Sequence, residues 1–246
     1  MLASLLTILL AAQSLPPEVM KHVVAGTTAQ QQGRHEEAIV EFTRVAVLAP
    51  ELAAAHVNLG GAYLRKGDYA AAVKPLRRAL ELNANLIGAH QMLGFALLSS
   101  GYSMEAIPHL EKAQSADGLG IALFKTGRLV EAVAQLHAAL EKRPNDPDLL
   151  YYLGQASGML SKQSLDTLQS AHPAAARTHQ LNGELNAIQR KLPEAEKAYR
   201  EALRLRPETP GVHLQLGEVY ASAGQWDKAE VEFRSEARAR PGDTEA

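Results

Sequence analysis

Residues 53–86, AAAHVNLGGAYLRKGDYAAAVKPLRRALELNANL, contain the pattern that decides the fold. Gly60 lies inside the first apolar, alanine-rich run, and Gly67 interrupts the chain seven residues later. Ala72 and Leu76, four residues apart, follow in the second run. A glycine such as Gly67 ends a helix in a left-handed conformation, and residues four apart share one face of the next helix. The stretch therefore predicts two antiparallel helices joined by a tight turn.

The same interior glycine recurs along the chain at a fixed interval. Successive members of three groups lie 34 residues apart: Gly26, Gly60 and Gly94; Gly120 and Gly154; Gly183 and Gly217. A constant interval of this length indicates a solenoid of stacked helical repeats, in which each repeat contacts mainly its neighbours. Because an interior glycine costs a helix about 1 kcal/mol relative to alanine, its recurrence predicts close approach of a partner helix.

These residues resemble the tetratricopeptide repeat family. The family pattern is almost complete in two places: Leu59-Gly60, Tyr63, Gly67, Tyr69, Ala72 and Ala79; and Leu216-Gly217, Tyr220, Gly224, Trp226, Ala229, Phe233 and Pro241. The resemblance implies an all-α, right-handed superhelical solenoid of about seven antiparallel helix pairs, as in bacterial scaffold proteins of this family. We expect repeats near 19–52, 53–86, 87–112, 113–146, 147–175, 176–209 and 210–243.

Two intervals depart from the pattern. Gly94 and Gly120 are only 26 residues apart, so part of a helix is missing, and Ala116-Asp117-Gly118 is expected to form a tight turn. The segment 161–171 lacks the alanine–aromatic–alanine pattern of a second helix, so the repeat near 147–175 is expected to be degenerate. Arg190 stands where a turn glycine belongs, and the following Pro193 fits the first turn of a helix.

The first residues form a separate segment. Residues 2–12, LASLLTILLAA, are uncharged and apolar, too few to span a bilayer but typical of the core of a signal peptide. A cleavage site is available at Ala12-Gln13-Ser14. We expect residues 1–14 to be a signal peptide, which predicts a periplasmic or extracellular protein. The alternative is a short amphipathic helix that covers the first repeat of a cytoplasmic protein.

Composition and motifs argue against several classes of function. The chain has 25 Lys and Arg against 27 Asp and Glu and contains no cysteine, so neither a basic nucleic-acid surface nor a cysteine-based metal site or thiolate nucleophile is expected. Phosphate-binding glycine loops and serine nucleophile elbows do not occur in the sequence. We predict no enzyme activity, no cofactor, no metal site, no nucleic-acid partner and no integral membrane span.

Five histidines occupy one position of the repeat: His22, His56, His90, His179 and His213. Helices that pack 8–10 Å apart would hold successive imidazoles too far apart to share one zinc ion. The resemblance places a large aromatic residue at this position. We therefore interpret the row as packing residues rather than metal ligands.

The resemblance implies that the first helix of each pair lines a concave groove that binds peptides. The groove residues that we predict are Val57, Leu64, Arg65, Gln91, Phe95, Leu98, Ile121, Phe124, Lys125, Tyr151 and Gln155. The apolar members gather beside the shortened repeats. If exposed, they mark a surface for an apolar or amphipathic segment. Alternatively, the shortened repeats draw them into the core.

We predict a non-enzymatic scaffold for protein–protein interaction, which binds a peptide or a partner segment in its groove. The alternative is a regulatory or substrate-recruiting subunit of an enzyme or an envelope assembly complex. The final helix is polar enough to face water, which favours a monomer or a weak oligomer. The identity of the partner does not follow from these residues.

Overall fold

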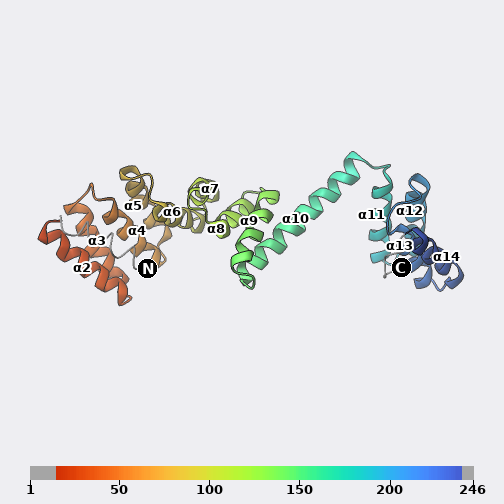
Figure 1. Ribbon diagram of the computed structural model, residues 1–246, viewed down its shortest axis with the longest axis horizontal. Helices are drawn as coiled ribbons and strands as arrows, with labels where there is room; N and C mark the ends of the chain where they lie inside the picture. The colour runs from red at the N-terminus through yellow and green to blue at the C-terminus, as the bar shows by residue number, and fades with distance from the viewer. Residues whose placement is uncertain (1–14, 240–246) are drawn as a thin grey trace. The chain divides into compact units, whose positions relative to one another are not determined.

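The computed structural model describes residues 15–239, which form thirteen helices and no strand (Figure 1). The expected signal peptide at residues 1–14 and Pro241 lie outside the described residues. The chain divides into two compact parts, unit 1 (Met1–Leu160) and unit 2 (Ser161–Ala246). The predicted all-α solenoid of helix pairs is confirmed by this architecture.

Unit 1 is a series of antiparallel helix pairs followed by one long helix. The first helix of each pair is called the A helix here, and the second the B helix. The pairs are α2 (Pro17–Gln31) with α3 (His35–Leu48), α4 (Ala53–Lys66) with α5 (Tyr69–Leu82), α6 (Ile87–Ser99) with α7 (Ser103–Lys112), and α8 (Ala116–Lys125) with α9 (Leu129–Lys142). The long helix is α10 (Pro147–Ala171), which begins in unit 1 and continues into unit 2.

Unit 2 contains two further pairs. These are α11 (Ala176–Ile188) with α12 (Leu192–Leu205), and α13 (Val212–Ser222) with α14 (Trp226–Ala239). In both units a B helix also contacts the A helix of the next pair, as α3 contacts α4 and α12 contacts α13. Each unit is therefore a stack in which apolar faces are buried between neighbours.

The interior glycines permit the close packing that their spacing predicted. A Cβ atom built on Gly60 would lie 2.5 Å from Cγ of Leu76 on the paired B helix, closer than real Cβ contacts allow. The glycine of the turn, Gly67, has a φ of +84°, the left-handed conformation that ends α4. Asp68 then caps α5 by accepting a hydrogen bond from the backbone N–H of Ala71 at 3.1 Å.

The turn expected at Ala116-Asp117-Gly118 is wrong, because α8 already begins at Ala116. The chain reverses just before it, at Gln114, which has a φ of +53°. Arg190 adopts a similar φ of +58° in the place of a turn glycine, and Pro193 lies in the first turn of α12 as predicted. Left-handed residues other than glycine are uncommon, so residue type alone did not reveal the turn at Gln114.

The core of each unit consists of alanines and large apolar side chains between the helices. In unit 1 the main cluster includes Leu76, Leu93, Leu110 and Leu136, and in unit 2 the cluster centres on residues such as Tyr199, Leu216 and Tyr220. Each fully buried leucine contributes about 1.5–3 kcal/mol. None of the helices in residues 15–239 is long and apolar enough to cross a membrane.

Candidate functional site

The predicted groove residues fall into three classes of burial. Six are exposed: Arg65, Gln91, Phe95, Lys125, Tyr151 and Gln155. Four are half-buried: Val57, Leu64, Ile121 and Phe124. Leu98 is buried, with 7% of its surface exposed. The helices that carry them adjoin one another: α4 contacts α6, α6 contacts α8, and Phe124 of α8 contacts Tyr152 of α10.

Several of the apolar residues belong mainly to the core. Leu98 is part of the main cluster of unit 1, and Leu64, Ile121 and Phe124 pack against that cluster. Both interpretations of the apolar residues therefore apply, each to different positions. Leu98 offers almost no surface to a partner, whereas the half-buried side chains keep part of their surface exposed.

Phe95 is the exposed apolar side chain that α6 contributes to the predicted groove. Its side chain is 48% exposed, and its ring meets the ring of Tyr69 edge to face, with 5.6 Å between the ring centroids. Such pairs contribute about 0.5–1.5 kcal/mol beyond their buried area, which restricts the orientation of both rings. Phe95 is thus an exposed aromatic side chain that is held in place from one side.

A second aromatic group joins α8 to the first turns of α10. Tyr152 lies edge to face with Phe124 at 5.6 Å, and Tyr151 lies edge to face with Tyr152 at 5.4 Å. Tyr151 is 61% exposed. The prediction from sequence missed Tyr69 and Tyr152, which support the exposed rings. The adjacent pair Tyr151-Tyr152 was the available signal, because neighbouring helical residues lie about 100° apart and one ring can support the other.

The polar residues of this surface are cationic or uncharged. Arg65 and Lys125 are exposed at the same position of their repeats, five residues after the A-helix glycine. Within the described part of the chain neither forms an ion pair. Gln91 and Gln155 add exposed amide groups, which can both donate and accept hydrogen bonds. We call the set Arg65, Gln91, Phe95, Lys125, Tyr151 and Gln155 the aromatic surface of unit 1.

The A helices of unit 2 have polar side chains at the equivalent positions. Gln180 donates to the side-chain oxygen of Gln215 at 2.9 Å, and Gln215 donates to Glu184 at 2.8 Å. This chain of hydrogen bonds connects α11 to α13. Glu218 is exposed nearby on α13. The A helices of unit 2 therefore present amides and carboxylates rather than aromatic rings.

The histidine row makes specific contacts within helix pairs. Nδ1 of His22 lies 2.6 Å from Glu41, and Nδ1 of His213 lies 2.6 Å from Glu232, in each case across one helix pair. The hydrogen bond with His22 holds the pKa of Glu41 below its ordinary value. These pairs join the A and B helices of the same repeat, which is a structural role.

The third repeat replaces this pair with two stacked histidines. Nε2 of His90 lies 3.1 Å from the carbonyl oxygen of Ala84, which can only accept, so this nitrogen donates. In the neutral pair Nδ1 of His90 must then accept from Nδ1–H of His109, at 2.8 Å. Burial lowers the pKa of His109, and the neighbouring His90 lowers it further. In residues 15–239 no group of three or more His, Asp or Glu side chains could hold a metal ion.

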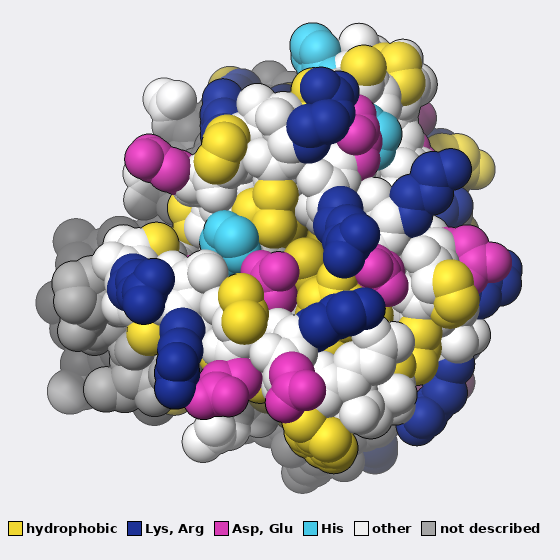
Figure 2. Space-filling view, turned by 90° about the vertical axis from the view of Figure 1, so that its right-hand side faces the viewer, with side chains coloured by type: hydrophobic (Ala, Val, Ile, Leu, Met, Phe, Trp, Pro, Cys, Tyr) yellow, Lys and Arg dark blue, Asp and Glu magenta, His cyan; other side chains and the backbone are white. Residues whose placement is uncertain are grey.

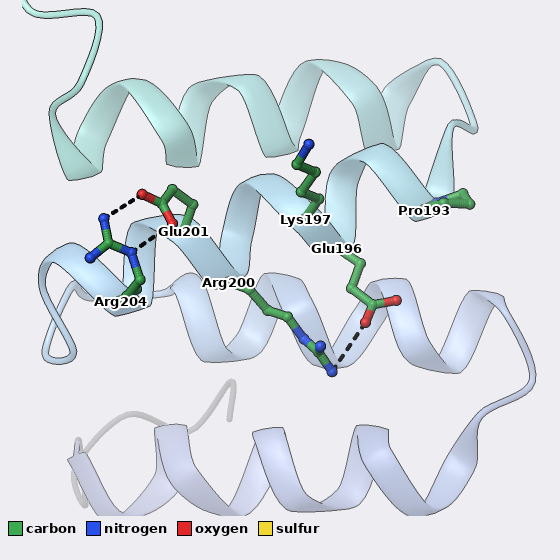
Figure 3. Close-up of a pocket in the computed structure, with 6 residues that line it drawn as sticks. All are labelled: Pro193, Glu196, Lys197, Arg200, Glu201 and Arg204. Carbon is green, nitrogen blue, oxygen red and sulfur yellow. Dashed lines mark hydrogen bonds and ion pairs between the residues drawn. The ribbon is translucent and has the colours of Figure 1, made fainter.

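A depression on α12 is lined by charged side chains, and most of these charges are paired with one another. Figure 3 shows the residues that line this depression: Pro193, Glu196, Lys197, Arg200, Glu201 and Arg204. Arg204 pairs with Glu201 at 2.7 Å and Arg200 with Glu196 at 3.1 Å. On the face seen in Figure 2, cationic and acidic side chains are likewise interspersed. Exposed pairs of this kind contribute little to binding or stability.

Comparison with known sequences decides the family. One sequence model, described as tetratricopeptide repeat, matches residues 23–86 and 188–244. A second, described as TPR repeat, matches residues 120–160. The chain belongs to the tetratricopeptide repeat family. Tetratricopeptide proteins are generally non-enzymatic scaffolds for protein partners, and the helix pairs described above are the repeats of that family.

Individual relatives are distant. The tetratricopeptide repeat-containing protein trd-1 of Caenorhabditis elegans is 29% identical over 113 residues, which are 46% of this chain and 14% of that protein. This chain therefore spans a small part of the length of that relative. A tetratricopeptide repeat protein from Parabacteroides merdae has a similar fold, with a TM-score of 0.51 and 16% identity over 84% of this chain and 86% of the other.

A further solved structure is that of YrrB, described as a TPR protein with an unusual peptide-binding site. It aligns with a TM-score of 0.42 and 19% identity over 82% of this chain and 93% of the other. At 16% identity, the structure from Parabacteroides merdae indicates the fold of this chain and not its ligand.

Proposed function

We propose that this tetratricopeptide protein is a non-enzymatic interaction scaffold, and that the aromatic surface of unit 1 binds a segment of its partner. The observation that carries the proposal is the exposure of Phe95, a large ring held by Tyr69 on a surface of stacked A helices. Exposed rings on a rigid support lose little conformational entropy on binding, which makes aromatic side chains effective anchors at interfaces.

The composition of the surface defines the class of segment that fits. Phe95 and Tyr151 offer apolar contact, while Gln91 and Gln155 can hydrogen-bond to an extended backbone. The unpaired cations favour carboxylates at the ends of the segment over lysines. We therefore expect an extended segment with apolar side chains in its middle and acidic side chains at its flanks.

Such a segment spans several helices. Arg65 on α4 and Lys125 on α8 are separated by the intervening helix α6. Packed helices lie 8–10 Å apart, so the two cations are separated by roughly 16–20 Å, which about six residues of extended chain cover. A peptide shorter than this would contact only one of the two cations.

A display library of random peptides about twelve residues long tests the proposal, since this length exceeds the estimated span. The full chain is used as bait, and the peptides that it enriches are then measured by fluorescence anisotropy. We expect apolar residues flanked by Asp or Glu, and at least about tenfold weaker binding to a Phe95→Ala variant because an anchor side chain is lost.

The matched control is Tyr102→Ala. Tyr102 is an exposed aromatic residue of the same unit, but it precedes the B helix α7 and lies outside the aromatic surface. It should leave the affinity unchanged. Equal binding by wild type and Phe95→Ala, or equal loss with Tyr102→Ala, would contradict the assigned surface. Leu98 is unsuitable for such a variant, because it is buried and a polar replacement would disturb the fold.

We also propose that the protein is exported and acts without catalysis of its own. Export is inferred from the apolar stretch at residues 2–12, followed by Ala12-Gln13-Ser14. The mass of the protein purified from a bacterial host checks it: loss of the first 14 residues supports cleavage. A full-length product in the cytoplasm would reject export and favour the alternative of a helix that covers the first repeat.

A further inference from the structure

Tyr199 of α12 has a hydroxyl group at a position where the other B helices have only hydrocarbon side chains. The residue at this position packs against the interior glycine of the paired A helix, and the others are Phe42, Leu76, Leu110, Leu136 and Phe233. The ring of Tyr199 packs in the same way, since a Cβ atom built on Gly183 would lie 2.8 Å from Cζ, the atom that carries the hydroxyl. Packing at this position therefore requires the ring and not the oxygen.

The hydroxyl of Tyr199 has no hydrogen-bond partner in the described part of the chain, although only 2% of the residue is exposed. In that part, the fully enclosed side-chain polar atoms without a partner are Nδ1 of His35 and Oγ of Ser100. The oxygen of Tyr199 is not one of them, so it reaches the surface. A buried tyrosine usually satisfies its hydroxyl with a hydrogen bond. This hydroxyl is available to a group that comes from outside.

Two carboxylates from neighbouring A helices adjoin this hydroxyl. Glu184 and Glu218 directly follow the interior glycines of α11 and α13, so they occupy the same position in consecutive repeats. Burial raises the pKa of Tyr199, and the charges of Glu184 and Glu218 raise it further, so both carboxylates act on the hydroxyl. The helices α11, α12 and α13 all belong to unit 2, and α11 contacts α13 directly.

Neither carboxylate is neutralised by a cation of the described chain. Within residues 15–239, Glu184 and Glu218 form no ion pair, and α13 contains no Lys or Arg. Arg177 is the one Lys or Arg of α11, and it donates to Gln180. From Gln180 the hydrogen bonds continue through Gln215 to Glu184, which holds one oxygen of that carboxylate in place.

We propose that this site binds a lysine or arginine side chain of a partner protein. The cation lies between the carboxylates of Glu184 and Glu218, and the oxygen of Tyr199 accepts a further hydrogen bond from it. Hydrogen bonds from a cation to a carboxylate are stronger than those between neutral groups. We call Glu184, Tyr199 and Glu218 the acidic site of unit 2.

The acidic site fits a cationic side chain better than a metal ion or a free small molecule. Calcium takes about 6–8 oxygen ligands, and no group of three or more His, Asp or Glu side chains in the described residues could hold a metal ion. Sites for small molecules enclose most of their ligand, whereas Glu218 is exposed. An open site with three polar side chains requires a ligand that makes further contacts along the A helices, as a basic protein segment does.

A display library of random peptides about twelve residues long tests the acidic site. The full chain with Phe95→Ala is the bait, so that peptides bound by the aromatic surface are not selected. We expect the library to be enriched in Lys and Arg. The most enriched peptide is labelled, and its affinity is measured by fluorescence anisotropy. A version of the peptide in which Gln replaces Lys and Arg should not bind.

Two variants of the chain then locate the contact. Glu218→Gln removes the charge of a carboxylate that has no other partner, and we expect at least about tenfold weaker binding of the peptide. Tyr199→Phe removes only the hydroxyl, and we expect about threefold to tenfold weaker binding. The thermal unfolding midpoint of the free chain should not fall in Tyr199→Phe, since Phe42 and Phe233 fill the equivalent positions. A fall would mean that the hydroxyl has a structural role, which would contradict the proposal.

The matched control is Glu194→Gln, which makes the same change of charge in unit 2. Glu194 is exposed in the first turn of α12, and its removal should leave the affinity unchanged. Equal losses in Glu218→Gln and Glu194→Gln, enriched peptides without Lys or Arg, or binding of spermidine as tight as that of the peptide would overturn the proposal. The acidic site and the aromatic surface lie in different units, so a failure of either proposal leaves the other standing.

Discussion

Units 1 and 2 use the same helix packing to present different surfaces. In unit 1, Gly94 packs against Leu110 with 2.6 Å between the built Cβ and Cγ, and in unit 2 the equivalent distance from Gly183 to the ring of Tyr199 is 2.5 Å. The residue after the glycine differs: it is Phe95 in the first case and Glu184 in the second. Packing against the B helix therefore constrains the glycine position of the A helix. The residue that follows the glycine is not constrained in this way and can be apolar or charged.

The comparison bears on the proposed location of the binding surface. The exposed phenyl ring of unit 1 can be desolvated by an apolar partner side chain, whereas Glu184 in unit 2 already accepts a hydrogen bond from Gln215. An apolar partner segment that covered unit 2 would leave carboxylates and amides without water, which costs free energy. This difference supports the proposal that an apolar segment binds on unit 1 rather than on unit 2.

The largest effect is expected from a charge placed in the core below the aromatic surface. Leu98→Glu buries a carboxylate in the cluster of unit 1 and should lower the free energy of unfolding by about 2–4 kcal/mol. Phe95→Glu, three residues away but half-exposed, should cost about 1 kcal/mol or less. Urea-induced unfolding followed by circular dichroism measures both. Similar losses for the two variants would mean that Phe95 also belongs to the core.

A second prediction concerns the glycines and has opposite signs at two sites. Gly120→Ala would place its Cβ 2.7 Å from Cγ of Leu136, so the paired helices must separate, at a cost of about 1–3 kcal/mol. Gly154→Ala meets no described atom within 4 Å and should stabilise α10 by about 0.5–1 kcal/mol. The midpoint of thermal unfolding should fall for the first variant and rise for the second. A loss in both would show that the face of α10 is covered.

The repeat register was predictable because its determinants are local. Three features act through the backbone of their own residue. They are the interior glycine that allows a close neighbour, the turn glycine with a positive φ, and the proline in the first turn of α12. Spacing then places the large residue of the B helix opposite the interior glycine. For these features, the residue type and the spacing between residues are sufficient to predict the structure.

Burial of individual A-helix residues was less predictable because it depends on neighbours. Leu98 and Phe95 are both apolar and lie on the same helix, yet only Leu98 belongs to the buried cluster of unit 1. The turn at Gln114 contains no glycine, so its left-handed backbone left no sign in the sequence. No glycine or proline occurs between Gly158 and Pro173, which is consistent with the uninterrupted helix α10. The absence of a helix-ending residue does not, however, predict how the helix packs.

A smaller effect is expected from the amide network of unit 2. Gln215→Ala removes the acceptor of Gln180, which is buried, and the donor to Glu184. The side chain of Gln180 would then lack this partner, and we expect a loss of about 1–2 kcal/mol. The exposed Gln225→Ala, in the turn before α14, is a control that should change the unfolding free energy little. Equal effects of the two changes would show that the network does not stabilise unit 2.

The smallest effect is a dependence of stability on pH that the histidine pair of unit 1 introduces. Burial lowers the pKa of His109 from 6.5, and the charges near it are those of His90, Lys112, Arg77 and Glu105. The unfolded chain therefore binds a proton more readily than the folded one, so stability is complete above the unfolded pKa and declines as the pH falls below it.

His109→Gln should remove this contribution while keeping a polar side chain beside His90. We expect the midpoint of thermal unfolding of the wild type to fall between pH 7.5 and pH 5 by at most about 2–4 °C more than that of the variant. The pairs His22–Glu41 and His213–Glu232 are present in both proteins, so their contributions cancel in the difference. Identical pH profiles would mean that His109 is protonated as readily in the folded chain as in the unfolded one, and the stacked pair would then have no part in the pH response.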